Sequence, residues 1–306
     1  MSSYHTVRAA SQLHTRLPSH FETSNPTIVL VNSFVTSSEL FRPQFEDERL
    51  TDAVNLIAID PLGHGYTRTK AEQWTFWDTA IMNFEVLTAL GIRGKVFVLG
   101  IGQGGWVTAR MALLAPLKVA GIIPIGTSMD AENKRTRKLG CWNAHETLTP
   151  LVNGLMSSTP TPDFYPPEQF VTREIENSFG SDVADDIRKK WTNEINFHYA
   201  GNEGRRRLRM AAINLRDRDS LHGRAFDVLC PVLWLHGSQD DVYGEENAKQ
   251  EIELFPNSPC AQFQSVAGGR HFSSWTHSRE VNQAIIDFLG RHGDLATMLR
   301  VDGQGR

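Results

Sequence analysis

The stretch Val96–Leu114, VFVLGIGQGGWVTARMALL, decides the fold because it joins two elements through a very short turn. It opens with four apolar residues, which is typical of a buried strand. Four glycines follow within six positions, at residues 100, 102, 104 and 105. The remainder has the apolar spacing of a helix, with Trp106 near its apolar face. The pattern predicts a strand, a crowded turn and a helix, with glycine where the backbone is strained or closely approached.

Two known motifs have this shape. One is the nucleophile elbow, G-x-S-x-G, in which a serine sits on a strained turn above a sheet. The other is the dinucleotide fingerprint G-x-G-x-x-G, which Gly100, Gly102 and Gly105 match. The two motifs imply different chemistry, so the rest of the chain must decide between them.

Short apolar runs and helical patterns alternate on both sides of this stretch. The predicted strands are 27–31, 56–59, 96–99, 119–125, 231–235 and 262–266, and the clearest further helices are 75–90 and about 277–289. Residues 1–26 are weakly patterned and are expected to hold one or two edge strands. This alternation predicts an α/β protein with a mostly parallel, doubly wound sheet covered on both faces.

The alternation stops after the fourth recognisable strand. Residues 133–225 carry helical patterns and no convincing strand, which predicts a helical lid over the carboxyl edge of the sheet. The expected division is a core made of residues 1–132 and 226–306, with a lid at 133–225. Residues 292–306 are expected to be a frayed tail.

Composition limits the function classes. A net charge of −4 argues against nucleic-acid or anionic-membrane partners, and an apolar fraction of 40% is ordinary for a globular protein. The basic cluster Arg205–Arg209 is expected to be a solvated helix face. The three cysteines are far apart, so neither a disulfide framework nor a metal site is expected. MSSYHTVRAAS has no signal-peptide pattern and no apolar run reaches about 18 residues, which predicts a cytoplasmic protein without a membrane span.

Four landmarks stand in a characteristic order. They are a strand ending in Asn32-Ser33-Phe34, the turn D-P-L-G-H-G at 60–65, the glycine-rich elbow, and H-G-x-x-D at 236–240 followed by G-G-x-H-F at 268–272. In this order the chain resembles the α/β-hydrolase fold family in its lidded form, over residues 27–290. The resemblance also disfavours the dinucleotide interpretation, because that fingerprint belongs in an opening βαβ unit with an acid ending the next strand.

The resemblance implies roles for residues that match the family's motifs. The elbow nucleophile corresponds to Gly102, the acid of the triad to Asp240 and its base to His271. The oxyanion hole corresponds to the backbone amides of Gln103 and Phe34. Residues expected to line a substrate pocket are Ser33, Ile101, Trp106 and Trp142. The hydroxyl of Ser33 could also reach the space left at Gly102, although an ordinary loop hydroxyl is the favoured interpretation.

Gly102 departs from the family, because glycine has no side chain with which to attack a carbonyl carbon. The first hypothesis is therefore an enzyme that has left hydrolysis and uses His271 and Asp240, without a cofactor, for lyase, isomerase or cyclase chemistry on a small, largely apolar substrate. The second is a serine ester or lactone hydrolase whose nucleophile was replaced. The third is a non-catalytic binder of a small ligand. The sequence leaves the substrate and the oligomeric state open.

Overall fold

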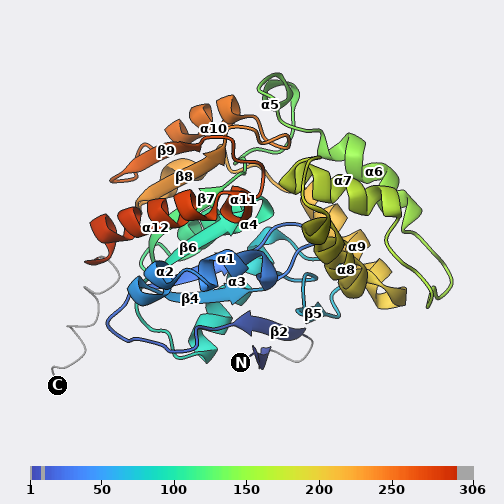
Figure 1. The fold of residues 1–306 in the computed structure, drawn as a ribbon, viewed down its shortest axis with the longest axis horizontal. Coiled ribbons are helices and arrows are strands. Elements are labelled where there is room, and N and C mark those ends of the chain that lie inside the picture. Colours follow the sequence, from blue (N-terminus) through green and yellow to red (C-terminus); the bar gives the residue numbers. More distant parts are fainter. Residues whose placement is uncertain (1, 8–10, 295–306) are drawn as a thin grey trace.

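A computed structural model of the chain describes residues 2–7 and 11–294 (Figure 1). The tail expected at 292–306 lies outside this part except for its first three residues. Within the described part nine strands form one sheet: β1 (Ser2–Val7), β2 (Ser11–Arg16), β3 (Thr27–Val31), β4 (Asn55–Ile59), β5 (Arg68–Thr69), β6 (Val96–Ile101), β7 (Val119–Ile125), β8 (Val232–Gly237) and β9 (Ala261–Val266).

The strand order is β1-β2-β4-β3-β6-β7-β8-β9, with β5 paired to β2. The strands from β4 to β9 along this order are parallel, and β1, β2 and β5 join the sheet antiparallel. Every residue of β3, β4, β6, β7 and β8 is buried, as expected for parallel strands covered on both faces. The sheet confirms the predicted mostly parallel, doubly wound architecture.

Helices outside the 133–225 segment cover the sheet. They are α1 (Arg42–Phe45), α2 (Glu48–Ala53), α3 (Phe76–Ala89), α4 (Gln103–Leu114), α10 (Glu245–Glu251), α11 (Ser273–Thr276) and α12 (Ser278–His292), with short 3-10 turns at Ser38–Phe41, Ala225–Asp227 and Ile252–Leu254. Helix α3 packs against α4, and α2 packs against α12. Within the described residues, no helix is both long and apolar enough to cross a bilayer.

The segment between β7 and β8 forms helices only. These are α5 (Lys134–Lys138), α6 (Ala144–Gly154), α7 (Glu168–Phe179), α8 (Asp185–Tyr199) and α9 (Gly201–Arg216). Figure 1 shows α6 to α9 gathered beside the sheet as a separate group, in which α6 packs on α9 and α7 packs on α8.

The basic cluster at the start of α9 is not a solvated face, contrary to the expectation. Arg207 is buried and donates to the backbone carbonyl of His198, at the end of α8. Arg205 donates to Oγ1 of Thr161 at 2.7 Å, and Arg206 donates to a carbonyl outside the helical segment. The expectation failed because Arg205 and Arg207 donate to backbone carbonyls at the ends of α6 and α8, and Arg206 donates to the carbonyl of Thr69 in β5.

Parallel pairing gathers four loops at one edge of the sheet. Ser33 follows β3, Gly102 follows β6, Asp240 follows β8 and His271 follows β9. Because β3 and β6 are neighbours, and β8 and β9 are neighbours, residues far apart in the sequence meet at the carboxyl ends of these strands.

Candidate active site

Gly102 forms the turn between β6 and α4. Its φ of 54° and ψ of −117° lie in a region that residues with side chains rarely adopt. The nearby glycines let the helix approach the sheet, since a Cβ at Gly100 would lie 2.1 Å from the carbonyl oxygen of Gly104. A Cβ at Gly105 would lie 2.5 Å from Thr127. Close packing of strand, turn and helix therefore accounts for these glycines without a bound phosphate.

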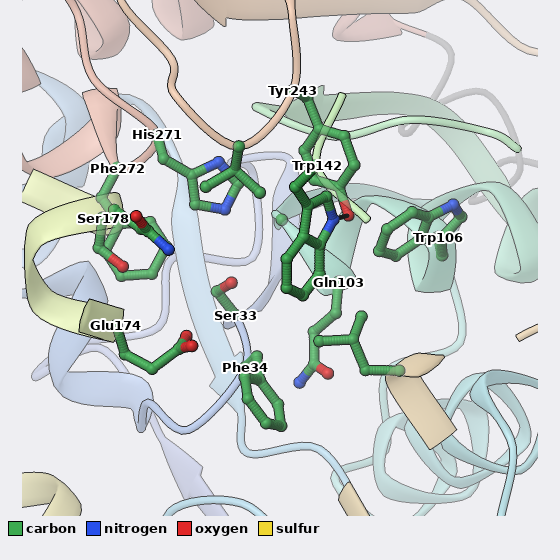
Figure 2. Close-up of a pocket in the computed structure, with 14 residues that line it drawn as sticks. Ser33, Phe34, Gln103, Trp106, Trp142, Glu174, Ser178, Tyr243, His271 and Phe272 are labelled. Atoms are coloured by element: carbon green, nitrogen blue, oxygen red, sulfur yellow. Dashed lines mark hydrogen bonds between the residues drawn. The ribbon is translucent and has the colours of Figure 1, made fainter. Parts of the chain in front are cut away.

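Ser33 fills the space above Gly102. A Cβ built on Gly102 would lie 2.3 Å from Oγ of Ser33 and 3.0 Å from Nε2 of His271. The hydroxyl and the imidazole therefore face each other across the position that an elbow side chain would take (Figure 2). No described residue forms a hydrogen bond with Oγ of Ser33. The sequence placed Ser33 in the pocket, but the interpretation favoured there was an ordinary loop hydroxyl, and the alternative that it reaches the space at Gly102 is the one that this geometry matches.

Asp240 and His271 are joined by a hydrogen bond. Nδ1 of His271 lies 3.0 Å from Oδ2 of Asp240, and both side chains are buried. The other carboxylate oxygen, Oδ1, accepts the backbone amides of Val242 at 2.8 Å and Tyr243 at 3.0 Å. Burial by itself raises the pKa of Asp240, but the charge and hydrogen bond of His271 outweigh it, and the net direction is downward. Asp240 is therefore held ionised.

This pairing fixes the tautomer of His271. An ionised carboxylate on this side of the ring accepts a hydrogen bond from Nδ1–H. The neutral ring therefore carries its proton on Nδ1 and keeps the lone pair on Nε2. Nε2 is the atom that faces Gly102 and Ser33. Asp241, the neighbouring acid, pairs instead with Arg270 at 3.2 Å on the surface. The geometry suits Asp240 and not Asp241 for orienting the imidazole.

Two backbone amides border the same space. Gln103 is the first residue of α4, and Phe34 follows Ser33 in the loop after β3. Neither amide donates a hydrogen bond to any residue in the described part of the chain. Free amides at a helix N-terminus and a neighbouring loop can hold a negatively charged oxygen.

The side chain of Gln103 is fixed away from this role. Its Nε2 lies 2.9 Å from Nε2 of His64, whose Nδ1 donates to the carbonyl of Leu62 at 2.9 Å. Burial lowers the pKa of His64 to about 4, so the ring is neutral and accepts from the amide. The side-chain nitrogen of Gln103 is thus engaged, whereas its Oε1 is buried without a hydrogen-bond partner among the described residues, and its backbone amide is free.

The cavity over Gly102 is small, about 40 Å³, which is room for a few water molecules in this arrangement. Its lining combines residues from the core loops and from the helical segment: Ser33, Phe34, Gly102, Gln103, Trp106, Trp142, Glu174, Asn177, Ser178, Leu215, Val242, Tyr243, His271 and Phe272 (Figure 2). Nε1 of Trp142 donates to the hydroxyl of Tyr243 at 3.0 Å, which ties the segment to the loop after β8.

Trp106 and Trp142, expected in the pocket, both border this cavity. Ile101 does not. It is the last residue of β6, pairs with Ile125 of β7 and is fully buried in the core. Its side chain remains in the sheet's packing layer because the strand continues through it and the turn begins one residue later.

Sequence analysis missed seven of the lining residues: Glu174, Asn177, Ser178, Leu215, Val242, Tyr243 and Phe272. The first three lie on one face of α7, and Figure 2 shows Glu174 pointing into the cavity below Ser178. Burial raises the pKa of Glu174 to about 7, against the opposing charges of His271 and Arg173. Their spacing of three and four residues is a detectable helix-face signal, although it does not reveal which face meets the site.

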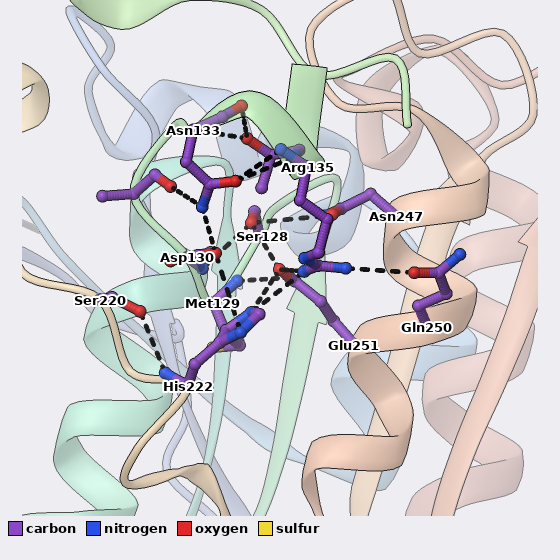
Figure 3. A network of polar contacts seen from close by, with 12 residues as sticks. Ser128, Met129, Asp130, Asn133, Arg135, Ser220, His222, Asn247, Gln250 and Glu251 are labelled. Carbon is purple, nitrogen blue, oxygen red and sulfur yellow. Dashed lines mark hydrogen bonds and ion pairs between the residues drawn. The ribbon is translucent and has the colours of Figure 1, made fainter. Parts of the chain in front are cut away.

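A second polar cluster lies away from this cavity (Figure 3). Possible ligand atoms of Asp130, His222 and Glu251 lie within 4.8 Å of one another. The carboxylate of Glu251 already accepts the amide of Met129 at 2.6 Å and His222 at 2.9 Å. The guanidinium of Arg135 lies 3.4 Å away. These donors occupy the carboxylate, so we assign the cluster to an ion-pair network that joins β7, α5 and α10.

Comparisons with known proteins agree with the fold. A family model described as the alpha/beta hydrolase fold matches residues 26–140. No curated protein sequence matches the chain.

Solved structures align over nearly the whole length. A thermophilic esterase from Thermogutta terrifontis aligns with a TM-score of 0.77 and 20% identity, covering 95% of this chain and 99% of its own. The enol-lactonase from Burkholderia xenovorans gives 0.75 and 16%, covering 94% and 100%. A bromoperoxidase from Bacillus anthracis gives 0.74 and 17%, covering 95% and 100%. At these identities the likeness concerns the fold.

Proposed function

Because this chain has the α/β-hydrolase fold, we propose that it is an enzyme in which His271 and Asp240 carry general acid–base chemistry in place of an elbow nucleophile. The observation that carries the proposal is the hydrogen bond between them, which leaves Nε2 of His271 facing the space above Gly102. A glycine at the elbow closes the acyl-enzyme route at that residue.

The reaction begins with a proton transfer. Nε2 of His271 removes a proton from the substrate, and Asp240 stabilises the resulting imidazolium. Negative charge that develops on a substrate oxygen is accepted by the free amides of Phe34 and Gln103. Proton abstraction with enolate stabilisation is the common first step of lyase, isomerase and cyclase chemistry, and it needs no cofactor.

We assign residues 133–225 to a lid and residues 1–132 and 226–306 to the core. Trp142, Glu174 and Leu215 belong to this segment and border the same cavity as Gly102 and His271. Because the cavity is only about 40 Å³, a substrate larger than a few water molecules enters when these helices move outward. The enclosed lining fits a small organic substrate.

The position of Ser33 favours one second candidate, a serine hydrolase with a relocated nucleophile. Its hydroxyl faces Nε2 of His271 above Gly102, and the amide of the following residue, Phe34, is free. A serine at position 33 in place of one at the elbow would retain a nucleophile, a base and an oxyanion hole. We rank it second because the structure has no hydrogen bond between Ser33 and His271 among the described contacts.

A fluorophosphonate probe and a p-nitrophenyl ester series distinguish the two candidates. We expect the unmodified chain to be neither labelled nor esterolytic, because the probe needs an activated nucleophile. Stoichiometric labelling that Ser33→Ala abolishes would establish the second candidate and reject the first. Ser220→Ala, in an exposed loop away from the cavity, is the matched control.

A further inference from the structure

We propose that Glu174 is a second catalytic residue, the acid that delivers a proton to the leaving group while His271 removes one from carbon. The substrate class is a small carbonyl compound with an oxygen substituent at its β-carbon, and the reaction is β-elimination. This inference rests on the proposed function and adds a group that the family's motifs do not contain.

Helix α7 is held against both loops of the site. The amide of Phe272 donates to the carbonyl of Ser178 at 2.9 Å, and the rings of Phe179 and Phe272 meet edge to face at 5.2 Å. One turn before Glu174, the ring of Phe170 packs edge-on against Phe34 at 6.2 Å. Glu174 lies between these anchors, so its position relative to His271 and the oxyanion amides is fixed by packing.

The carboxyl group is directed at the cavity and is unused by the protein. Glu174 borders the cavity, and within the described part of the chain no hydrogen bond to its carboxyl is found. By contrast Glu176, two residues along on another face of α7, pairs with Arg188 at 3.2 Å. A carboxyl that borders the cavity and lacks a partner among the described residues is available to a substrate.

The surroundings keep this carboxyl protonated near neutral pH. The charged or titratable groups that face it are His271 across the cavity and Arg173 on its own helix, with Tyr243 on the far wall. Burial outweighs the opposing electrostatic effects of His271 and Arg173 and raises the pKa of Glu174 to about 7. A base held by an ionised aspartate and an acid kept neutral by burial have the complementary protonation states that acid–base catalysis needs.

The presence of a separate acid favours elimination over acyl transfer. In acyl transfer one imidazole both takes the proton and returns it, so a second acid has no task. In elimination the proton leaves carbon but must reach a different atom, the departing oxygen. His271 then serves C–H cleavage, the two amides stabilise the enolate, and Glu174 serves C–O cleavage.

The step balances. Nε2 of His271 takes the α-proton, and the C–H electron pair forms the enolate. The enolate collapses to the C=C bond as the C–O bond breaks, with its electron pair leaving on oxygen. Glu174 protonates that oxygen, and water or an alcohol departs. The proton held by His271 returns through solvent to the Glu174 carboxylate.

The test uses the full chain in D₂O with a panel of small β-hydroxy and β-alkoxy ketones, followed by NMR. Deuterium exchange at the α-carbon reports on His271 alone, and appearance of the enone reports on both groups. We expect Glu174→Gln to keep exchange and to lower enone formation by about 10²-fold or more. His271→Ala should lose both, and Glu176→Gln should lose neither.

The outcomes separate the two proposals. Exchange and elimination that both survive Glu174→Gln contradict the role of Glu174 and leave the role of His271 standing. Failure of the unmodified chain to exchange any member of the panel contradicts the proposed function itself. The pH profile of enone formation should lose its alkaline limb in Glu174→Gln while exchange at the α-carbon is retained. That result supports Glu174 as an acid and not as a structural residue.

Discussion

The hydroxyl oxygen of Ser33 lies 2.3 Å from the point where a β-carbon of residue 102 would be. The loop after β3 thus supplies a polar group to the space that the glycine at the elbow leaves open. The same point is 3.0 Å from Nε2 of His271, so base and hydroxyl remain opposite each other although the elbow side chain is absent.

The first prediction returns the hydroxyl to the elbow. Gly102→Ser alone should give little fluorophosphonate labelling, because its side chain meets Ser33 and its φ of 54° adds about 1–3 kcal/mol of strain. Ser33→Ala combined with Gly102→Ser removes the collision and places Oγ beside His271. We expect the double variant to be labelled and weakly esterolytic.

Ser33→Ala with Gly102 retained is the control, and it should not be labelled. If Gly102→Ser alone were as reactive as the double variant, Ser33 would not be an obstacle at the elbow. That result would contradict the claim that its hydroxyl occupies the space of an elbow side chain.

The second prediction concerns the acid–base pair. His271→Ala should lower turnover by about 10²–10⁴-fold, the usual contribution of a general base. Asp240→Asn should cause much of the same loss of turnover, because an amide no longer fixes the proton on Nδ1. Asp241→Asn, a change one residue away at the surface pair with Arg270, should have little effect. Steady-state assays with the substrate found by the ketone panel provide the measurement.

Unchanged turnover in His271→Ala would mean that the imidazole is not the base, and the acid–base mechanism would be rejected. An unmodified chain that turns over no substrate, with weaker ligand binding as the sole effect of His271→Ala, would indicate a protein that binds without catalysing.

The order of motifs was enough to predict which side chains meet at the carboxyl edge. Asp240 and His271 follow different strands, but parallel strands end at one edge, so the topology places them together. The free amides of Phe34 and Gln103 follow from the same loops. These features depend on local turns and strand order, and both can be inferred from sequence patterns.

The sequence could not predict how near two loops approach. Ser33 reaches the space above Gly102 because β3 pairs directly with β6, and its hydroxyl position depends on that contact. Glu174 was missed because periodicity shows that α7 has faces but not where the helix docks. Ile101 was misplaced because its neighbour Gly102 begins the turn, while Ile101 itself still belongs to the strand.

A third prediction tests the ion-pair network in Figure 3 as a support of the fold. Glu251→Ala removes the acceptor of Met129, Ser128 and His222, leaving buried donors unpaired. We expect a loss of about 2–4 kcal/mol in the free energy of unfolding. Glu253→Ala, which is exposed in the next turn, should change it by less than about 0.5 kcal/mol. Urea unfolding of both variants measures the difference, and equal stabilities would show that the network does not support the fold.

The last prediction follows from the raised pKa of Glu174 and needs no substrate. Because the folded chain holds this proton up to a pKa of about 7, against an ordinary value of 4.5, deprotonation between these values favours the unfolded state. The stability of the unmodified chain should therefore fall as pH rises through this window. Glu174→Gln cannot ionise, so it should match the unmodified chain near pH 5 and exceed it above about pH 7.5.

The expected excess is about 1–2 kcal/mol, reduced from the full linkage value because solvent reaches the carboxyl through the cavity. Urea unfolding from about pH 5 to pH 8.5 measures it. Glu176→Gln is the matched control, since that carboxyl is ion-paired near the surface and should give a pH-independent difference. A stability difference for Glu174→Gln that does not grow with pH would mean that the carboxyl is already ionised, and Glu174 could then not act as the acid.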